Sequence, residues 1–180
     1  MIKLPESSGN RAILILVWTT ALVALWGSAY INANYLEKIP HVQDSVNTLF
    51  QARIFSMGKL YMEAPDRVLS FSSELIRMQN GRWFSHIPFL VPLAFMFGYK
   101  LGITWLVNPI IAMLSVLLVY KVGKEFYSPL AGLLASIFLT SSPFFMVMSA
   151  SFMSHPMGLF LTTACIFFIF RNLQQPNYKH

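Results

Sequence analysis

Asp44 is the residue whose type and position best suit chemistry. It stands in the stretch HVQDSVNTLFQAR, residues 41–53, shortly after a long apolar segment. A carboxylate held at a membrane interface can act as a general base toward an attacking hydroxyl or amine. The alternative is structural, because Asp is among the best residues for capping a helix and suits the positive end of the helix dipole. Both roles are compatible with a position of Asp44 at the start of a helix.

Basic residues follow Asp44 in the same polar segment. Guanidinium groups can hold a phosphate and stabilise the charge that develops on it as it leaves. The alternative, for each residue taken singly, is that its charged end merely reaches from the membrane interface into water. The candidate phosphate-binding residues are Arg53, Arg67 and Arg82, with Lys59 and Arg77 between them in the chain.

Histidines supply further candidates for binding. His155, in SFMSHPMG, falls at a predicted outer turn, where it would either bind a substrate near Asp44 or lie among lipid headgroups. His41 precedes Asp44 by three residues, and this pair could bind a divalent cation. The four histidines otherwise lack the spacing of metal ligands. The sequence contains no Gly-rich phosphate loop, nucleophile elbow or zinc-protease motif.

The composition assigns the chain to the integral membrane proteins. Hydrophobic residues make up 56% of its 180 residues and charged residues only 11%, against roughly 25% charged in a soluble domain. A soluble fold of this size could not cover so much apolar surface with polar groups.

The net charge of +6 comes without a basic run interleaved with aromatics. Anionic lipids or a phosphate-bearing substrate therefore suit it better than nucleic acid. A lone cysteine, Cys165, excludes a disulfide within the chain.

Four apolar stretches are candidates for membrane spans. The first carries no charge and is longer than the 7–15-residue core typical of a cleaved signal peptide, which favours an uncleaved anchor. The third contains Pro143 and is expected to be broken or kinked there. In the second we expect Asn108 to bond backbone groups that Pro109 leaves free. The expected spans are residues 12–31, 103–120, 129–150 and 156–170.

The segment between the first two expected spans, residues 32–102, contains three further helical patterns. Residues 42–57 have an apolar side at helical spacing, which predicts an amphipathic helix resting on the membrane interface and ending at Gly58. Residues 68–79 suggest a second short helix. Residues 87–99 are apolar but short and interrupted by two prolines, so we expect a re-entrant or interfacial helix there.

The basic residues that flank the spans indicate the topology. Lys3 and Arg11 precede the first span, and Lys121, Lys124, Arg171 and Lys179 all reach the same side if residues 87–99 do not cross. The positive-inside rule then puts both termini in the cytoplasm and residues 32–102 outside. The prediction is an all-α polytopic membrane protein of about four spans, forming one membrane domain over residues 1–180.

The ordered series of segments resembles a known family. The segments are HVQDSVNTLFQARIFSMGKLY, GRWFSHIPFLVPL, LVNPIIAMLSVLLVYKVGKEFYSPLAGLLASIFLTSSPFF and MSASFMSHPMGLFL. They resemble the amino-terminal part of the GT-C glycosyltransferases. The similarity is greatest to bacterial relatives of the dolichyl-phosphate-mannose–protein mannosyltransferases and the lipid A aminoarabinose transferases, and it covers essentially the whole chain. It implies a polyprenyl-phosphate sugar donor, an inverting transfer and a catalytic acid just past the first span, where Asp44 stands.

The chain also departs from the pattern of these relatives. Many have an Asp-Glu pair where this chain has Asp44 followed by Ser45. Many have Lys-Pro-Pro or Tyr-Pro-Pro-Gly where this chain reads SHIPFLVP, so Ser85 and His86 replace a basic or tyrosyl side chain. The resemblance still allows His86 to donate to a phosphate. Family members usually have eight or more spans, and a chain of about four resembles a fragment of one.

Three classes of function follow from these features. The leading expectation is a glycosyltransferase, or its amino-terminal part, in the bacterial inner membrane. Its partners would be a polyprenyl-phosphate sugar, a lipid, glycan or protein acceptor, and membrane lipids. The alternative is a non-enzymatic scaffold or assembly subunit, which the missing second acid and the short length favour. A transporter ranks last, because its spans would carry polar or charged residues near their middle.

Overall fold

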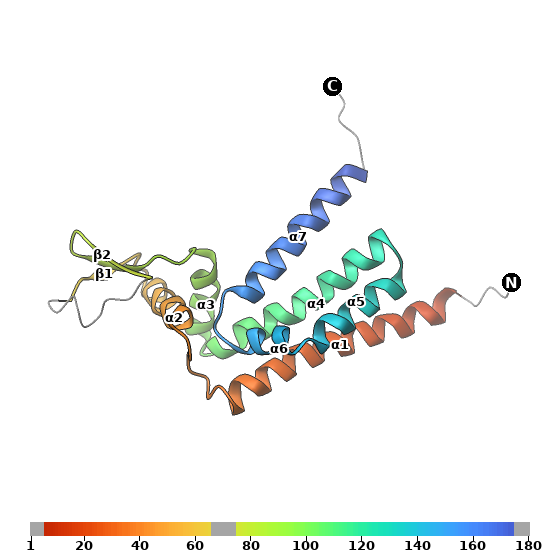
Figure 1. The fold of residues 1–180 in the computed structure, drawn as a ribbon, viewed down its shortest axis with the longest axis horizontal. Coiled ribbons are helices and arrows are strands. Elements are labelled where there is room, and N and C mark those ends of the chain that lie inside the picture. The colour runs from red at the N-terminus through yellow and green to blue at the C-terminus, as the bar shows by residue number, and fades with distance from the viewer. Residues whose placement is uncertain (1–5, 66–74, 175–180) are drawn as a thin grey trace, which may run out of the picture.

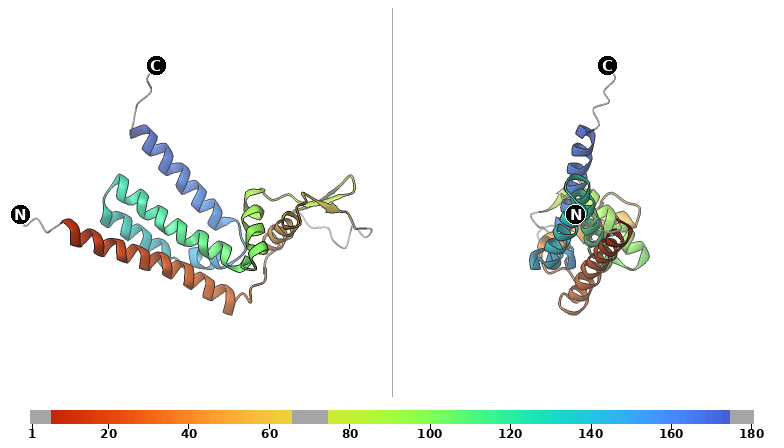
Figure 2. Two further views of the ribbon diagram at one scale, coloured as in Figure 1. Left: turned by 180° about the vertical axis from the view of Figure 1, so that it is seen from behind. Right: turned by 90° about the vertical axis from the view of Figure 1, so that its right-hand side faces the viewer.

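The computed structural model describes residues 6–65 and 75–174 and places the long helices together in one bundle (Figure 1). Figure 2 shows α4 and α5 lying between α1 on one side and α7 on the other. The start of α1 and the end of α7 lie away from the shorter elements, which gather at the opposite end of the bundle (Figure 1). The bundle helices are α1 (Glu6–Asn34), α4 (Val107–Phe126), α5 (Pro129–Ser141), α6 (Pro143–Ala150) and α7 (His155–Gln174).

Three helical segments in the described part of the chain are long and apolar enough to cross a membrane: Gly9–Asn34, Thr104–Phe126 and His155–Leu173. Helices α5 and α6 make a fourth span if they are counted together, with a bend of 66° between them. The bend falls at Pro143, which has no N–H to continue the helix, and the Ser142 hydroxyl accepts a bond from the Phe145 N–H at 3.3 Å. The prediction of an all-α polytopic membrane protein is confirmed.

The bundle helices pack through small residues. A Cβ atom added to Gly123 of α4 would lie 2.4 Å from the Cα of Gly132 in α5, so the two backbones touch at this point. Ala21 and Ala24 of α1 and Ala112 of α4 are completely buried. Close approach through small residues is the usual way in which helices associate within a membrane, where apolar side chains gain little by leaving lipid.

Helix α2 (Gln43–Ser56) forms where the sequence predicted it, but it buries polar residues as well as Ile54 of the predicted apolar side. The buried residues include Asn47, Thr48 and Gln51, whereas Val42 and Val46 on the apolar side are exposed. Gln51 explains the orientation, because its Nε2 donates to the Leu60 carbonyl at 3.0 Å and its Oε1 accepts from the Ser85 N–H at 2.8 Å. Buried polar side chains need such partners. They come from the segments between α1 and α4, which lie beyond the end of the bundle and which we call the outer segments.

Gly58 ends α2 as predicted. It adopts a positive φ of 74°, and the following Lys59 N–H bonds back to the Ile54 carbonyl at 3.2 Å. Helices commonly end in this way, with a glycine in the left-handed conformation.

A small antiparallel sheet follows α2 and was not predicted. Its strands are β1 (Met62–Glu63), β2 (Ile76–Gln79) and β3 (Arg82–Ser85), in the order β1-β3-β2. The prediction of a short helix at residues 68–79 is therefore wrong for residues 76–79, which form β2. Residues 68–74 lie outside the described part of the chain. Asn80 and Gly81 join β2 to β3 with φ angles of 51° and 72°, the geometry that an Asn-Gly hairpin turn requires.

Helix α3 (Leu90–Leu101) is too short to cross the membrane, as the sequence indicated. It packs against α2, and its buried Phe95 contacts Phe152 with ring centroids 5.9 Å apart. The chain then passes through the 3₁₀ turn η2 (Thr104–Leu106) into α4. Helix α3 therefore links α2 to the residues that join α6 to α7.

Candidate functional site

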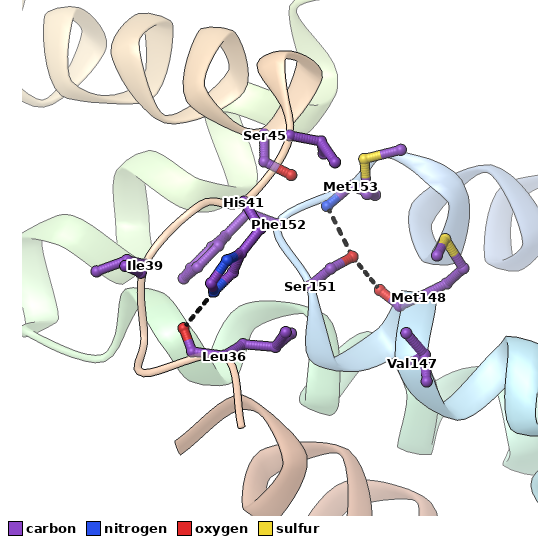
Figure 3. Close-up of a pocket in the computed structure, with 10 residues that line it drawn as sticks. Leu36, Ile39, His41, Ser45, Val147, Met148, Ser151, Phe152 and Met153 are labelled. Atoms are coloured by element: carbon purple, nitrogen blue, oxygen red, sulfur yellow. Dashed lines mark hydrogen bonds between the residues drawn. The ribbon is translucent and has the colours of Figure 1, made fainter. Parts of the chain in front are cut away.

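A cavity of about 160 Å³ lies between the start of α2 and the end of α6 (Figure 3). We call it the α2 pocket. Its walls are almost entirely apolar, and its volume is close to that of an apolar cavity that accepts a guest the size of benzene. An isoprenyl unit and a short part of an acyl chain are both apolar and small enough to fit such a pocket. The lining residues are Leu36, Ile39, His41, Val42, Ser45, Val147, Met148, Ser151, Phe152 and Met153.

Two buried asparagines fix the wall of the α2 pocket that residues 151–153 form. The Asn108 Nδ2 donates to the carbonyls of Ser151 at 2.6 Å and Met153 at 2.8 Å. The Asn32 Nδ2 donates to the Ala150 carbonyl. The expectation that Asn108 serves the backbone beside Pro109 is thus wrong. These amides instead donate to carbonyls at and just after the end of α6, where no further helical turn supplies N–H donors.

Ser45 brings a buried hydroxyl to the α2 pocket. Its side chain is 1% exposed, and its Oγ has no hydrogen-bond partner in the described structure. Figure 3 shows the hydroxyl directed toward Phe152 and Met153 across the pocket. A buried polar group without a partner costs roughly 1–3 kcal/mol. A ligand oxygen in the pocket would offer the missing partner.

Asp44 lies one residue before Ser45, in the first turn of α2. It is exposed and does not itself line the α2 pocket, although Ser45 and Val42 in the same short stretch do. The N-cap position belongs to Val42 and receives no side-chain bond, so the capping role considered for Asp44 is wrong. Its carboxylate forms no ion pair with a cation in the described ranges. The side chain is accessible to a substrate, next to the positive end of the helix dipole.

His41 lines the α2 pocket on the side of α1. Its Nε2 lies 3.0 Å from the Leu36 carbonyl (Figure 3), so this nitrogen carries a proton and Nδ1 remains available in the neutral ring. Within residues 6–65 and 75–174, no three His, Cys, Asp or Glu side chains form a metal-binding group. The divalent cation suggested for His41 and Asp44 stays a prediction.

The arginines lie elsewhere in the outer segments. Arg53 follows Asp44 by nine residues of one helix, which is roughly 13 Å along its axis. It lies near Tyr99: burial raises the pKa of Tyr99, and the charge of Arg53 lowers that pKa in part. Arg82 lies over the Tyr61 ring, 4.6 Å from its centroid. Arg67 lies outside the described residues. Arg53 and Arg82 are therefore not brought into an ion pair with Asp44.

The two histidines proposed for binding occupy different places. His86 is exposed directly after β3, and its backbone N–H bonds to the Leu75 carbonyl at 2.7 Å. His155 begins α7 and lines a second cavity of about 320 Å³. Met148 lines both this cavity and the α2 pocket. Only His155 is thus linked to the α2 pocket through a shared wall.

A comparison with models of protein families assigns this chain to a family. A model of the family described as dolichyl-phosphate-mannose-protein mannosyltransferase matches residues 86–180, which are 95 of the 180 residues. The chain belongs to this family. It is therefore a membrane glycosyltransferase chain of the GT-C type. No curated protein and no solved structure matches it.

The family match covers only part of the candidate site of this mannosyltransferase-family chain. Residues 86–180 include the α6 wall of the α2 pocket, with Asn108 and His155. Asp44, His41 and Ser45 precede the matched part. Sequence reasoning noted Ser45 only as a departure from the usual pair of acids and missed Asn32. The available signal was a polar residue at the end of an apolar span, which usually has a partner or a function.

Proposed function

We propose that this chain carries the catalytic acid and part of the donor site of a polyprenyl-phosphate-sugar-dependent glycosyltransferase. The observation that supports the proposal is the position of Asp44. Its accessible side chain lies in the chain between Val42 and Ser45, which line an apolar pocket whose far wall belongs to the segment that the family matches. An acid and a lipid-sized pocket side by side suit a reaction in which the donor is a lipid and the acceptor loses a proton.

The α2 pocket would receive an apolar part of the donor lipid close to its phosphate. Its volume of about 160 Å³ suits one isoprenyl unit. The phosphate would then lie near the start of α2, where a helix terminus favours negative charge. The Ser45 hydroxyl is available there as a donor. His155 is the best placed of the predicted binding residues, because its cavity shares Met148 with the pocket.

The chemistry is a single displacement. The Asp44 carboxylate removes the proton from an acceptor hydroxyl or amine as the acceptor atom forms its bond to the anomeric carbon. The bond from that carbon to the phosphate oxygen breaks on the opposite face, and its electron pair leaves with the polyprenyl phosphate. The configuration of the sugar is inverted. Arg53, Arg67, Arg82 and His86 remain proposals for neutralising the leaving phosphate.

The charge distribution supports transfer on the outer face. Arg11, Lys121, Lys124 and Arg171 lie toward the end of the bundle that is opposite to α2 (Figure 1). The positive-inside rule places such an end in the cytoplasm. The amino terminus is then cytoplasmic, Asp44 lies outside, and the membrane is the inner membrane of a bacterium.

A non-enzymatic scaffold remains the second candidate. The observation that favours it is that the Asp44 carboxylate has no ion pair with a described cation, although the neighbouring loop is rich in arginine. A scaffold would need neither a proton acceptor nor a donor pocket, and it would bind donor no better than other membrane proteins do.

Replacing Asp44 by Asn tests the proposal. The assay is sugar transfer from a polyprenyl-phosphate-linked donor by the full-length protein in membranes. We expect Asp44→Asn to lower kcat at least roughly 100-fold, the usual contribution of a general base, while donor affinity is retained. Glu63→Gln is the control, because Glu63 is an exposed acid in the sheet. Transfer that persists in Asp44→Asn removes Asp44 from the mechanism, and a wild-type protein without transfer or donor binding favours the scaffold.

A further inference from the structure

A polar cavity lies at the end of the bundle opposite to the α2 pocket. It has a volume of about 220 Å³ and lies between the start of α1 and the last turns of α4. Figure 1 shows the start of α1 and the end of α4 at the same end of the bundle, away from α2. We call it the basal cavity. Its lining residues are Asn10, Arg11 and Leu14 of α1 with Tyr120 and Lys124 of α4.

The two cations of the basal cavity form no ion pair with an acid whose side chain the structure describes. Among the side chains that the structure describes, the one ion pair joins Arg171 to Glu125, with an N–O distance of 3.8 Å. The helix ends here carry four cations, Arg11, Lys121, Lys124 and Arg171, against two acids, Glu6 and Glu125, for a formal charge of 4 − 2 = +2. Two cations that reach one cavity from different helices form a natural site for an anion.

Close helix packing fixes the α4 side of the basal cavity. A Cβ atom added to Gly132 of α5 would lie 2.5 Å from the Tyr120 carbonyl oxygen and 2.9 Å from the Lys124 backbone nitrogen. The Lys124 ammonium lies 5.9 Å from the centroid of the Tyr120 ring. Both residues thus stand on backbone that α5 holds in place. A site held by packing loses less entropy when it binds a ligand.

The groups in the basal cavity match the needs of a phosphate. Arg11 can give two parallel N–H bonds to its oxygens, and Lys124 adds a compact positive charge. The Tyr120 hydroxyl and the Asn10 amide can donate to the remaining oxygens. Leu14 leads from these groups along the exposed apolar side of α1, where an acyl chain would lie. Tyrosine is also typical of the membrane–water interface.

We propose that the basal cavity binds the phosphate group of an anionic phospholipid in the cytoplasmic leaflet. The proposal does not depend on the proposed glycosyl transfer, because the cavity and Asp44 lie at opposite ends of the spans. A free phosphate ion offers the same oxygens, and the two sources differ in whether the acyl chains contribute to binding.

The test uses the full chain in detergent. The probes are dioleoyl phosphatidylglycerol, dioleoyl phosphatidylcholine and inorganic phosphate, and binding is measured by native mass spectrometry and by the thermal unfolding midpoint. We expect Arg11→Gln with Lys124→Gln to weaken phosphatidylglycerol binding roughly 30-fold. The matched control, Lys121→Gln with Arg171→Gln, removes the same charge at the same end of the bundle. It should weaken binding about threefold or less.

A conservative variant keeps the test independent of folding. Tyr120→Phe retains the ring and should weaken phosphatidylglycerol binding roughly fivefold by removing one hydrogen bond to an anion. Binding of phosphatidylglycerol that depends on Arg11, Lys124 and Tyr120 supports a lipid phosphate. The same dependence for inorganic phosphate alone supports the phosphate site and assigns it to the free ion. Equal losses in the cavity variant and in its control overturn the proposal, as does binding of phosphatidylcholine that equals binding of phosphatidylglycerol.

Discussion

The helix bundle and the outer segments of this chain are held together by different interactions. The bundle relies on direct contact of small residues, such as Gly123 against Gly132. The outer segments rely on side chains that bond to backbone, such as Gln51 to Leu60 and Ser85. Buried oxygens without a described partner also gather near the outer end: Asn32 Oδ1, Ser45 Oγ, Asn108 Oδ1 and Ser149 Oγ. Contact packing makes a rigid support, whereas spare polar atoms are places where a substrate or water can bind.

The largest expected effect comes from breaking the contact between α4 and α5. Gly123→Ala places a Cβ atom 2.4 Å from the Gly132 backbone, and backbone cannot move aside as a flexible side chain can. We expect a loss of about 3 kcal/mol in the free energy of unfolding, measured by thermal or denaturant unfolding in detergent. Gly158→Ala is the control, since a Cβ atom there meets nothing within 4 Å. Similar stability of the two variants would contradict direct contact of the backbones.

Removing a bond from the outer end should cost less. Asn108→Ala leaves the Ser151 and Met153 carbonyls without their donor, and we expect a loss of about 2 kcal/mol. Hydrogen exchange should also increase at residues 151–153. Asn34→Ala provides the comparison, because its exposed amide bonds only within α1, to Tyr30 at 2.9 Å. If Asn108→Ala is no worse than Asn34→Ala, Asn108 does not hold the wall of the α2 pocket.

The smallest effect on stability, and one of opposite sign, is expected at Ser45. Ser45→Ala removes a buried hydroxyl that lacks a described partner, so the free energy of unfolding should rise by up to about 1 kcal/mol. Donor affinity should fall at the same time if the hydroxyl meets the donor. Ser115→Ala is matched to it, because the Ser115 hydroxyl is equally buried but bonds to the Ile111 carbonyl at 2.8 Å. Equal destabilisation by both changes would show that Ser45 has a partner.

The two regions also differ in how far the sequence predicts them. Apolar length and Pro143 indicate the spans and their break, because a membrane requires continuous apolar helices. The end of α2 follows from Gly58. The orientation of α2 does not follow, because the apolar pattern does not reveal that Gln51 has partners at Leu60 and Ser85.

The sheet and the pocket also differ in how far the sequence predicts them. Asn80-Gly81 between β2 and β3 is a local hairpin signal that could have been used. The α2 pocket joins residues more than one hundred positions apart, from Ser45 to Phe152, and no local pattern predicts such a contact. The catalytic role expected for Asp44 came from the resemblance to the family. The pocket that the neighbouring Val42 and Ser45 line was found only in the fold.

Labelling at Val42 tests most directly whether the α2 pocket is an outward-facing donor site. Val42 lines the pocket and is 47% exposed. Val42→Cys would be made in a Cys165→Ala background, with Tyr127→Cys in the turn between α4 and α5 as the control for the cytoplasmic side. We expect a membrane-impermeant maleimide to label position 42 from outside and position 127 only after permeabilisation. A polyprenyl-phosphate-linked sugar should protect position 42 alone. Labelling of position 42 only after permeabilisation, or labelling that the donor leaves unchanged, would contradict the account.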